Sequence, residues 1–381
     1  MHYHTLLTGW LIGAAFVSPA TGQETGGQST EQRQATAVAQ VAEPPLPVRC
    51  EVLPLAGHQV AFSVDGEERT RWHFGPQYPR PFFFPLNAPV SPSAAAPVSL
   101  TRMGHPGAEN HDHHRSVWFA LDDVDGIRFW SDSAGTQIQQ KHWYAYLDGD
   151  QEAVMATRLG WYDAEGRERL EQDLVAALIP GVEGQYAIEL QIDLRPPQGA
   201  TSVVLGKTNF GFLAVRVAAS LSVHFGDGRL TNSEGAVGET AIFAKPARWV
   251  DYSGPIAVGT GNQRRTEFAG ITYFDHPENP RYPTHWHVRE DGWMGAAFCL
   301  NDSYTLTHQQ TLRLRYLLQV HRGIYDEAEA AAVQESFAAR PGFTIRPARR
   351  DEPHRQYVVQ RSPVAGEPDS DSVEYVPQSS P

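Results

Sequence analysis

Short apolar segments bounded by turn residues recur along most of this chain, and they favour β-strands over helices. The segments Val60–Val64 and Arg69–Phe74 flank Asp65-Gly66, a pair that suits the tight turn of a β-hairpin. Only Tyr325–Arg340, rich in Ala and Glu and followed by Pro341-Gly342, predicts a helix. Further strands are predicted at 116–121, 137–146, 152–162, 167–178, 186–194, 213–217, 270–274, 295–298 and 311–320. The pattern predicts an all-β fold, a large antiparallel β-sandwich with one C-terminal helix.

The two ends of the chain differ in composition from the middle. Residues 1–22 contain an apolar run followed by small residues, which predicts a secretory signal peptide and an exported protein, periplasmic or extracellular. Residues 23–47 are polar with a Pro-rich end, and residues 349–381 are rich in Pro, Ser, Asp and Glu. We expect a disordered linker and a disordered acidic tail there. The predicted single domain therefore covers residues 48–348.

Charge and composition limit the partners of the folded domain. The formal net charge of −13 argues against nucleic acid and anionic membranes as partners. No segment after residue 22 is long and apolar enough to predict an integral membrane segment in the mature chain. The nine tryptophans are compatible with a carbohydrate or sugar-derived small molecule as partner, and equally with an aromatic core. Cys50 and Cys299 form either one disulfide or two buried free thiols.

A histidine-rich stretch, His105–Arg115, is the strongest functional signal in the chain. Within it, positions 111–115 hold three histidines, an aspartate and an arginine. Imidazole is both a common metal ligand and the usual proton shuttle near neutral pH. In an extended backbone His111 and His113 would share one face and His114 the other. A second motif, His285-Trp286-His287, repeats the alternation far downstream, and we expect the fold to bring the two segments together.

These motifs define a predicted site. For acid–base chemistry we predict His113 and His114 as base or ligand, His287 as their partner and Glu234 as acid. Glu239 lies in the same glycine-rich segment, and an exposed loop is the alternative for both glutamates. The residues predicted to bind substrate are Arg115, Arg289, Trp118, Trp286 and Asn232. The cofactor is open between none and a divalent metal, whose candidate ligands are His111, His113 and His285.

Three further segments carry local predictions. Residues 79–110, rich in Pro, Ser and Ala, predict a long irregular loop that leads into the histidine-rich stretch. Asp122, Asp123 and Asp125 precede a glycine but lack the later glutamate of a helix-loop-helix calcium site, so an acidic turn is favoured. Residues 217–225 predict a strand that ends at His224.

Several of these motifs together resemble a known bacterial family. Asn110–Phe119 and Asp123–Trp130 resemble the pattern DHPHHRGLWFGHGDVNGVDFW of the family labelled methane oxygenase PmoA-like, whose function is unknown. Later blocks match in the same order over roughly residues 58–325, namely 232–235, 249–254, 275–281 and 284–289. The chain departs from the pattern at Asn110, Asp112 and Ser116, where the family usually has Asp, Pro and Gly.

The resemblance implies a fold and a context. It implies a galactose-mutarotase-like β-sandwich, with a sugar site on a concave sheet face, in a secreted or periplasmic protein of polysaccharide-degrading bacteria. A methane monooxygenase subunit is not expected, because that subunit is an integral membrane protein. We therefore expect an exported carbohydrate-active enzyme, a lyase, hydrolase or epimerase with non-redox acid–base or metal-assisted chemistry.

Two alternatives remain at this stage. The first is a non-catalytic glycan-binding or interaction module, with Trp118, Trp130 and Trp286 as stacking platforms. The second is a metal-dependent oxygenase with an iron site made from His111, His113 and either Asp275 or Glu234.

Overall fold

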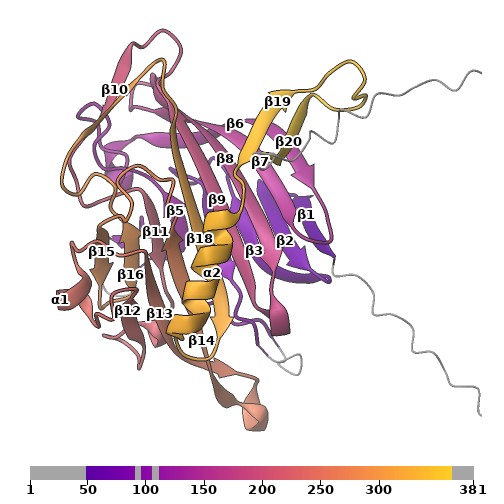
Figure 1. Ribbon diagram of the computed structural model, residues 1–381, viewed down its shortest axis with the longest axis vertical. Coiled ribbons are helices and arrows are strands. Elements are labelled where there is room, and N and C mark those ends of the chain that lie inside the picture. The colour runs from indigo at the N-terminus through magenta and orange to yellow at the C-terminus, as the bar shows by residue number, and fades with distance from the viewer. Residues whose placement is uncertain (1–48, 91–95, 105–110, 363–381) are drawn as a thin grey trace, which may run out of the picture. The chain divides into compact units, whose positions relative to one another are not determined.

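The computed structural model describes residues 49–90, 96–104 and 111–362 (Figure 1). The predicted signal peptide, the predicted linker and the tail from residue 363 lie outside these ranges, as do residues 105–110 of the histidine-rich stretch. None of the helices in the described ranges has the length and apolarity that crossing a lipid bilayer requires.

Two eight-stranded antiparallel sheets make up most of this structure, which confirms the all-β prediction. Sheet 1 consists, in spatial order, of β1 (Cys50–Leu55), β2 (Gln59–Val64), β3 (Glu67–His73), β4 (Phe82–Leu86), β5 (Val117–Phe119), β11 (Leu213–Arg216), β16 (Trp293–Ala296) and β15 (Trp286–Arg289). Sheet 2 consists of β12 (Arg229–Asn232), β13 (Trp249–Val258), β14 (Arg265–Asp275), β18 (Leu312–Arg322), β9 (Tyr186–Arg195), β8 (Glu168–Pro180), β7 (Ala153–Tyr162) and β6 (Gln137–Leu147). Two separate two-stranded sheets pair β10 (Ser202–Leu205) with β17 (Tyr304–Thr307) and β19 (Phe343–Pro347) with β20 (Tyr357–Arg361).

The core lies between the two sheets. Alternate residues of the strands point into it, as Val60, Phe62 and Val64 of β2 do. The hairpin between β2 and β3 turns at Asp65 and Gly66, which both have positive φ, as a tight primed turn requires. The prediction of this hairpin is therefore confirmed, both in the burial of alternate residues and in the geometry of the Asp-Gly turn.

The C-terminal elements cover the outer face of sheet 2. Helix α2 (Glu327–Ala339) buries Ala330 and Phe337 against Trp249, Phe274 and Leu317 of this sheet, and it runs along the strands in Figure 1. The β19–β20 hairpin packs on strands β7 and β8 of the same sheet. The outer face of sheet 2 is thus occupied by the chain itself.

The structure differs from the sequence prediction in three places. Strand β4 lies inside the predicted loop 79–110, because the prolines conceal the buried residues Phe82 and Phe83. Residues 219–221 form a short 3-10 turn where a strand was predicted at 217–225. Strand β20 extends the folded part of the chain to Arg361, beyond residue 348 where the domain was predicted to end.

Cys50 and Cys299 are both buried free thiols, which is the second of the two alternatives expected from the sequence.

Candidate functional site

One row of residues crosses sheet 1 and connects the two histidine motifs. His287 of β15 pairs with Gly295 of β16, Ala214 of β11 pairs with the same glycine, and Trp118 of β5 pairs with Ala214. Residues opposite one another in neighbouring strands project to the same face. Gly295 and Ala214 are small, and a Cβ on Gly295 would lie only 2.9 Å from Nε1 of Trp293. The missing side chain therefore leaves space in which the Trp293 indole lies.

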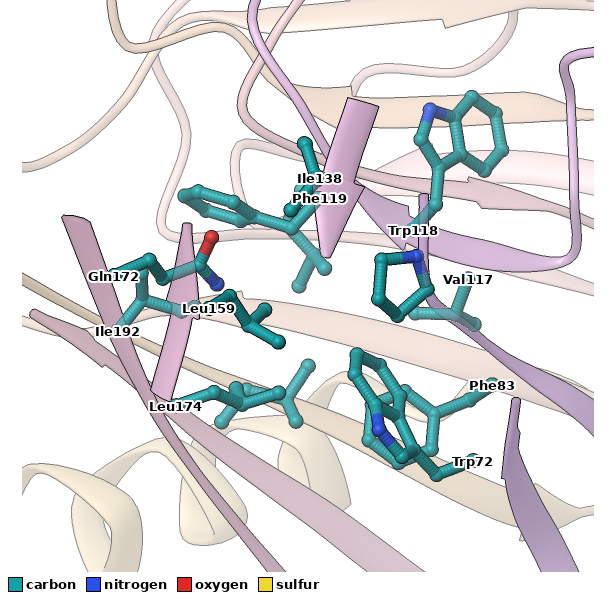
Figure 2. Close-up of a pocket in the computed structure, with 13 residues that line it drawn as sticks. Trp72, Phe83, Val117, Trp118, Phe119, Ile138, Leu159, Gln172, Leu174 and Ile192 are labelled. Carbon is teal, nitrogen blue, oxygen red and sulfur yellow. The ribbon is translucent and has the colours of Figure 1, made fainter. Parts of the chain in front are cut away.

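This row is buried, because Trp118, Ala214 and His287 are each at most 2% exposed. Val117, Trp118 and Phe119 all line the cavity between the sheets, and Figure 2 shows the Trp118 indole pointing away from the centre of that cavity. The cavity measures only ≈ 20 Å³ and its lining is apolar except for Gln172. It has room for about one water molecule, so it is a packing void and not a substrate site.

The described part of the histidine-rich stretch is a turn. The backbone N–H of His114 donates to the carbonyl of His111 at 3.0 Å, so the predicted extended alternation of the histidines is wrong. As a result the three rings meet on one side. The ring centroids of His113 and His114 lie 4.3 Å apart, and those of His111 and His114 lie 4.9 Å apart. The His114 ring is buried and stacks on Trp118 at 5.2 Å.

Trp293 joins the turn to the second histidine motif. Its indole meets the His114 ring edge-on, with centroids 4.5 Å apart, and stacks on the His287 ring at 4.7 Å. Trp130 and Phe210 complete the aromatic cluster around Trp293, at 5.3 and 6.1 Å. The expected convergence of the two segments is confirmed, and an indole mediates it.

Two of the histidines are neutral over most of the pH range. Burial, and then the charge of Arg80, lower the pKa of His113 to about 4, and the charge of Asp132 offsets only part of this effect. Burial likewise lowers the pKa of His287 to about 4. Nδ1 of His287 lies 2.8 Å from the carbonyl oxygen of Asn209. In the neutral ring Nδ1 therefore carries the proton, and Nε2 is left as an acceptor.

A compact ion cluster lies beside His113. Asp132, in a short 3-10 turn (Asp132–Ala134), accepts two hydrogen bonds from Arg115, at 3.2 and 2.6 Å. Nη2 of Arg80 lies 3.1 Å from the same carboxylate. Burial raises the pKa of Asp132, but the hydrogen bond from Arg115 and the charge of Arg80 outweigh it and hold that pKa below its usual value. Two guanidinium groups thus share one carboxylate here.

Arg289 lies beyond His287 on the same strand face. Its guanidinium donates to Oε1 of Glu239 at 3.1 Å and lies over the ring of Phe243 at 4.6 Å. Glu239 begins the short helix α1 (Glu239–Ile242), and its second oxygen accepts the backbone N–H of Glu290 at 2.9 Å. Arg289 is therefore held in place next to the histidines, at the end of the aromatic cluster opposite Arg80.

Three of the other predicted residues have structural partners elsewhere. Trp286 is fully buried, donates to the carbonyl of Ala247 and faces the core. The Asn232 side chain accepts the backbone N–H groups of Glu234 and Ala236, so it stabilises a turn. The Glu234 side chain is 57% exposed and lies 3.8 Å from Arg248. None of these contacts connects Trp286, Asn232 or Glu234 with the histidine turn.

The candidate metal ligands do not form a set. Within the described ranges, no three His, Cys, Asp or Glu side chains are arranged to hold a metal ion. His285 precedes β15 and its Nε2 lies 3.0 Å from the Asn301 amide, away from the contacts among His111, His113 and His114. Asp275 is buried with Asn279 and the backbone of Thr284. The residues that the structure describes therefore do not fit the predicted metal sites.

Three site residues were not predicted from the sequence. Arg80 was hidden in a proline-rich segment, Asp132 stands alone between serines, and Trp293 belongs to no motif. For Trp293 the sequence offers one signal: the small residue Gly295, two positions later, leaves space for an indole on the same strand face.

The acidic turn at Asp122–Asp125 is confirmed, because Asp123 accepts the N–H of Gly126 and a bridge pairs Val124 with Ile127.

Comparison with known proteins finds a matching family but no protein of known activity. A profile described as "Family of unknown function (DUF6807)" matches residues 59–335. No curated protein matches the chain. The matched region contains every residue of the aromatic and histidine clusters, so these clusters belong to the part of the chain that the family shares.

Proposed function

The chain belongs to the DUF6807 family of unknown function, and we propose that it is an exported enzyme that acts on a sugar or sugar-derived acid by non-redox acid–base chemistry. The observation that carries this proposal is the continuous path of ring contacts from His113 through His114 and Trp293 to His287. Two neutral imidazoles at the ends of one aromatic cluster supply proton acceptors, and one of them, His113, is partly exposed. The PmoA-like resemblance and its polysaccharide-degrading context remain sequence predictions that agree with this proposal.

His113 is the proposed base, because it is partly exposed and lies beside the cations that would hold a polar or anionic substrate. Its pKa of about 4 is low for a base. An anion bound near Arg80 would offset the positive charge that lowers this pKa, so substrate binding would make His113 more basic. Arg115 and Arg289 would orient the substrate from the two ends of the cluster.

The alternatives receive less support from the same residues. A binding module would use Trp118, Trp130 and Trp286 as exposed platforms, but all three are less than 5% exposed. An oxygenase site made from His111, His113 and Asp275 or Glu234 would need carboxylates whose partners lie elsewhere. The acid–base reading relies only on contacts among described residues.

The test is turnover of neutral and acidic sugars and oligosaccharides, followed by proton NMR. His113→Gln and His287→Gln are expected to lower turnover by about 100-fold or more, since a lost general base costs that much. His308→Gln, at an exposed position in a turn, is the matched control and should behave as wild type. Equal turnover by all three variants would contradict the proposal. Binding of sugars by wild type with no product would favour the binding module.

A further inference from the structure

Arg80 is the most unusual charged residue of the site. Its side chain is 1% exposed, yet none of its three guanidinium nitrogens has an aligned hydrogen-bond partner in the described ranges. Among the described residues its ion-pair partner is Asp132, and this carboxylate also accepts two well-aligned hydrogen bonds from Arg115. Buried guanidinium groups are normally saturated with acceptors, because desolvating an unpaired charge is costly. Arg80 therefore has unused donors at the edge of the proposed active site.

Among the residues that the structure describes, the charges around Arg80 leave a surplus of one positive charge. Arg80 and Arg115 are cationic, Asp132 is the carboxylate that contacts both, and His113 is neutral at pH 7. Asp132 and His113 are partly exposed, so the cluster is open to solvent on that side. A small anion that reached it would meet free donors and an uncompensated charge.

We propose that Arg80 and Arg115 form a subsite for the carboxylate of a sugar acid, next to His113. This inference rests on the proposed function and names its substrate class. The planar guanidinium matches a carboxylate through two parallel N–H···O bonds. Arg115 already binds Asp132 in that way, and a substrate carboxylate would give Arg80 the equivalent partner.

The subsite also assigns a role to Asp132. Asp132 occupies the Arg115 donors and lies against Arg80, so it competes with an incoming carboxylate for both guanidinium groups. Removing its charge should strengthen carboxylate binding, whereas a purely structural ion pair would give no such gain. This opposite effect distinguishes a binding subsite from a packing arrangement.

The experiment compares the affinities of sodium glucuronate, galacturonate and acetate with those of glucose and galactose, by calorimetry at constant ionic strength. Wild type is expected to bind the uronates at least about tenfold more tightly than the neutral sugars, as charged hydrogen bonds allow. Asp132→Asn should strengthen uronate binding several-fold, and Arg80→Gln should abolish the preference. Arg313→Gln, which breaks a similar pair with Asp193 on sheet 2, is the control and should change nothing.

Three results would overturn the subsite. They are equal affinity for uronates and neutral sugars in wild type, an unchanged uronate affinity in Asp132→Asn, and acetate binding as tightly as the uronates. The Asp132→Asn arm decides the question even if Arg80→Gln fails to fold. Neutral-sugar turnover that depends on His113 would leave the proposed function intact while the subsite fails. Uronate binding that depends on Arg80, with no product from any sugar, would leave the subsite intact while the proposed function fails.

Discussion

The imidazole of His287 stacks on the indole of Trp293, with the two ring planes 28° apart and their centroids at 4.7 Å. The same indole lies perpendicular to the His114 ring, with the two ring planes 90° apart. Trp293 thus fixes the relative position of two histidines that come from distant parts of the chain. Its own position depends on the absence of a side chain at Gly295.

Gly295→Ala is expected to displace the Trp293 indole, because the new Cβ would lie 2.9 Å from Nε1. Overpacking of this kind costs about 1–3 kcal/mol of unfolding free energy. Urea denaturation and near-UV circular dichroism measure the loss and the changed tryptophan environment. In a Trp293→Phe background the same substitution should cost less, since the smaller ring leaves room. Equal costs in both backgrounds would show that the indole does not depend on Gly295.

Glu239→Gln is expected to weaken sugar binding up to about fivefold, because Arg289 loses its ion pair and with it a fixed orientation. Glu234→Gln, the residue predicted as acid from the sequence, should leave binding and turnover within about twofold of wild type, since its side chain is exposed and its contacts lie in the β12 turn. Calorimetric titration and initial rates test the pair. A larger loss in Glu234→Gln than in Glu239→Gln would reverse the assignment.

The imidazole of His113 is expected to titrate at about pH 4 in a two-dimensional NMR experiment, well below the ordinary value. Because its pKa is lowered on folding, the neutral form contributes stability above pH 6.5, and this contribution is lost as the pH falls towards 4. Arg80→Gln should raise the midpoint by removing the neighbouring positive charge. Arg313→Gln should leave it unchanged. A midpoint near 6.5 in wild type would contradict the burial and charge effects.

Asp275 should give the opposite pH dependence of stability. Burial raises its pKa to about 7, although hydrogen bonds from Asn279 and Thr284 oppose this. A raised pKa means that the folded state holds the proton more tightly, so the contribution is complete below about pH 4 and is lost as the pH rises to about 7. The unfolding free energy of Asp275→Asn is expected to fall less than that of wild type between these values. Parallel urea series at several pH values make the comparison.

Arg361 should stabilise the C-terminal hairpin against sheet 2. It donates to Glu152 and to Glu189, and the Glu189 side chain is fully buried. Arg361→Gln is expected to cost about 3 kcal/mol, as breaking a buried pair does, while Arg313→Gln at a more exposed pair should cost less than about 1 kcal/mol. A chain that ends at residue 348 should be less stable than one that ends at 362. Urea midpoints that do not differ would contradict this role.

Strand positions could be predicted well from local patterns, because period-two alternation and Asp65-Gly66 are local signals of burial and turn geometry. Strand β4 could not, since Pro81 and Pro85 read as loop residues although they stand among buried phenylalanines. The histidines of the site were found because their density is unusual. Trp293 and Arg80 were not, because a single aromatic or basic residue becomes informative only when its neighbours in space are known.

Strand β5, strand β11 and the hairpin of β15 and β16 are neighbours in sheet 1, although long stretches of chain separate the three. A fragment that ends before β16 contains the histidine turn but lacks both the indole and the strand that keep His287 near it. Because the C-terminal end of this region supplies Trp293, a growing polypeptide completes the arrangement only late in its synthesis. Fragments released by proteolysis between these strands would each retain some of the histidines, but none would hold the His114 and His287 rings on either side of Trp293.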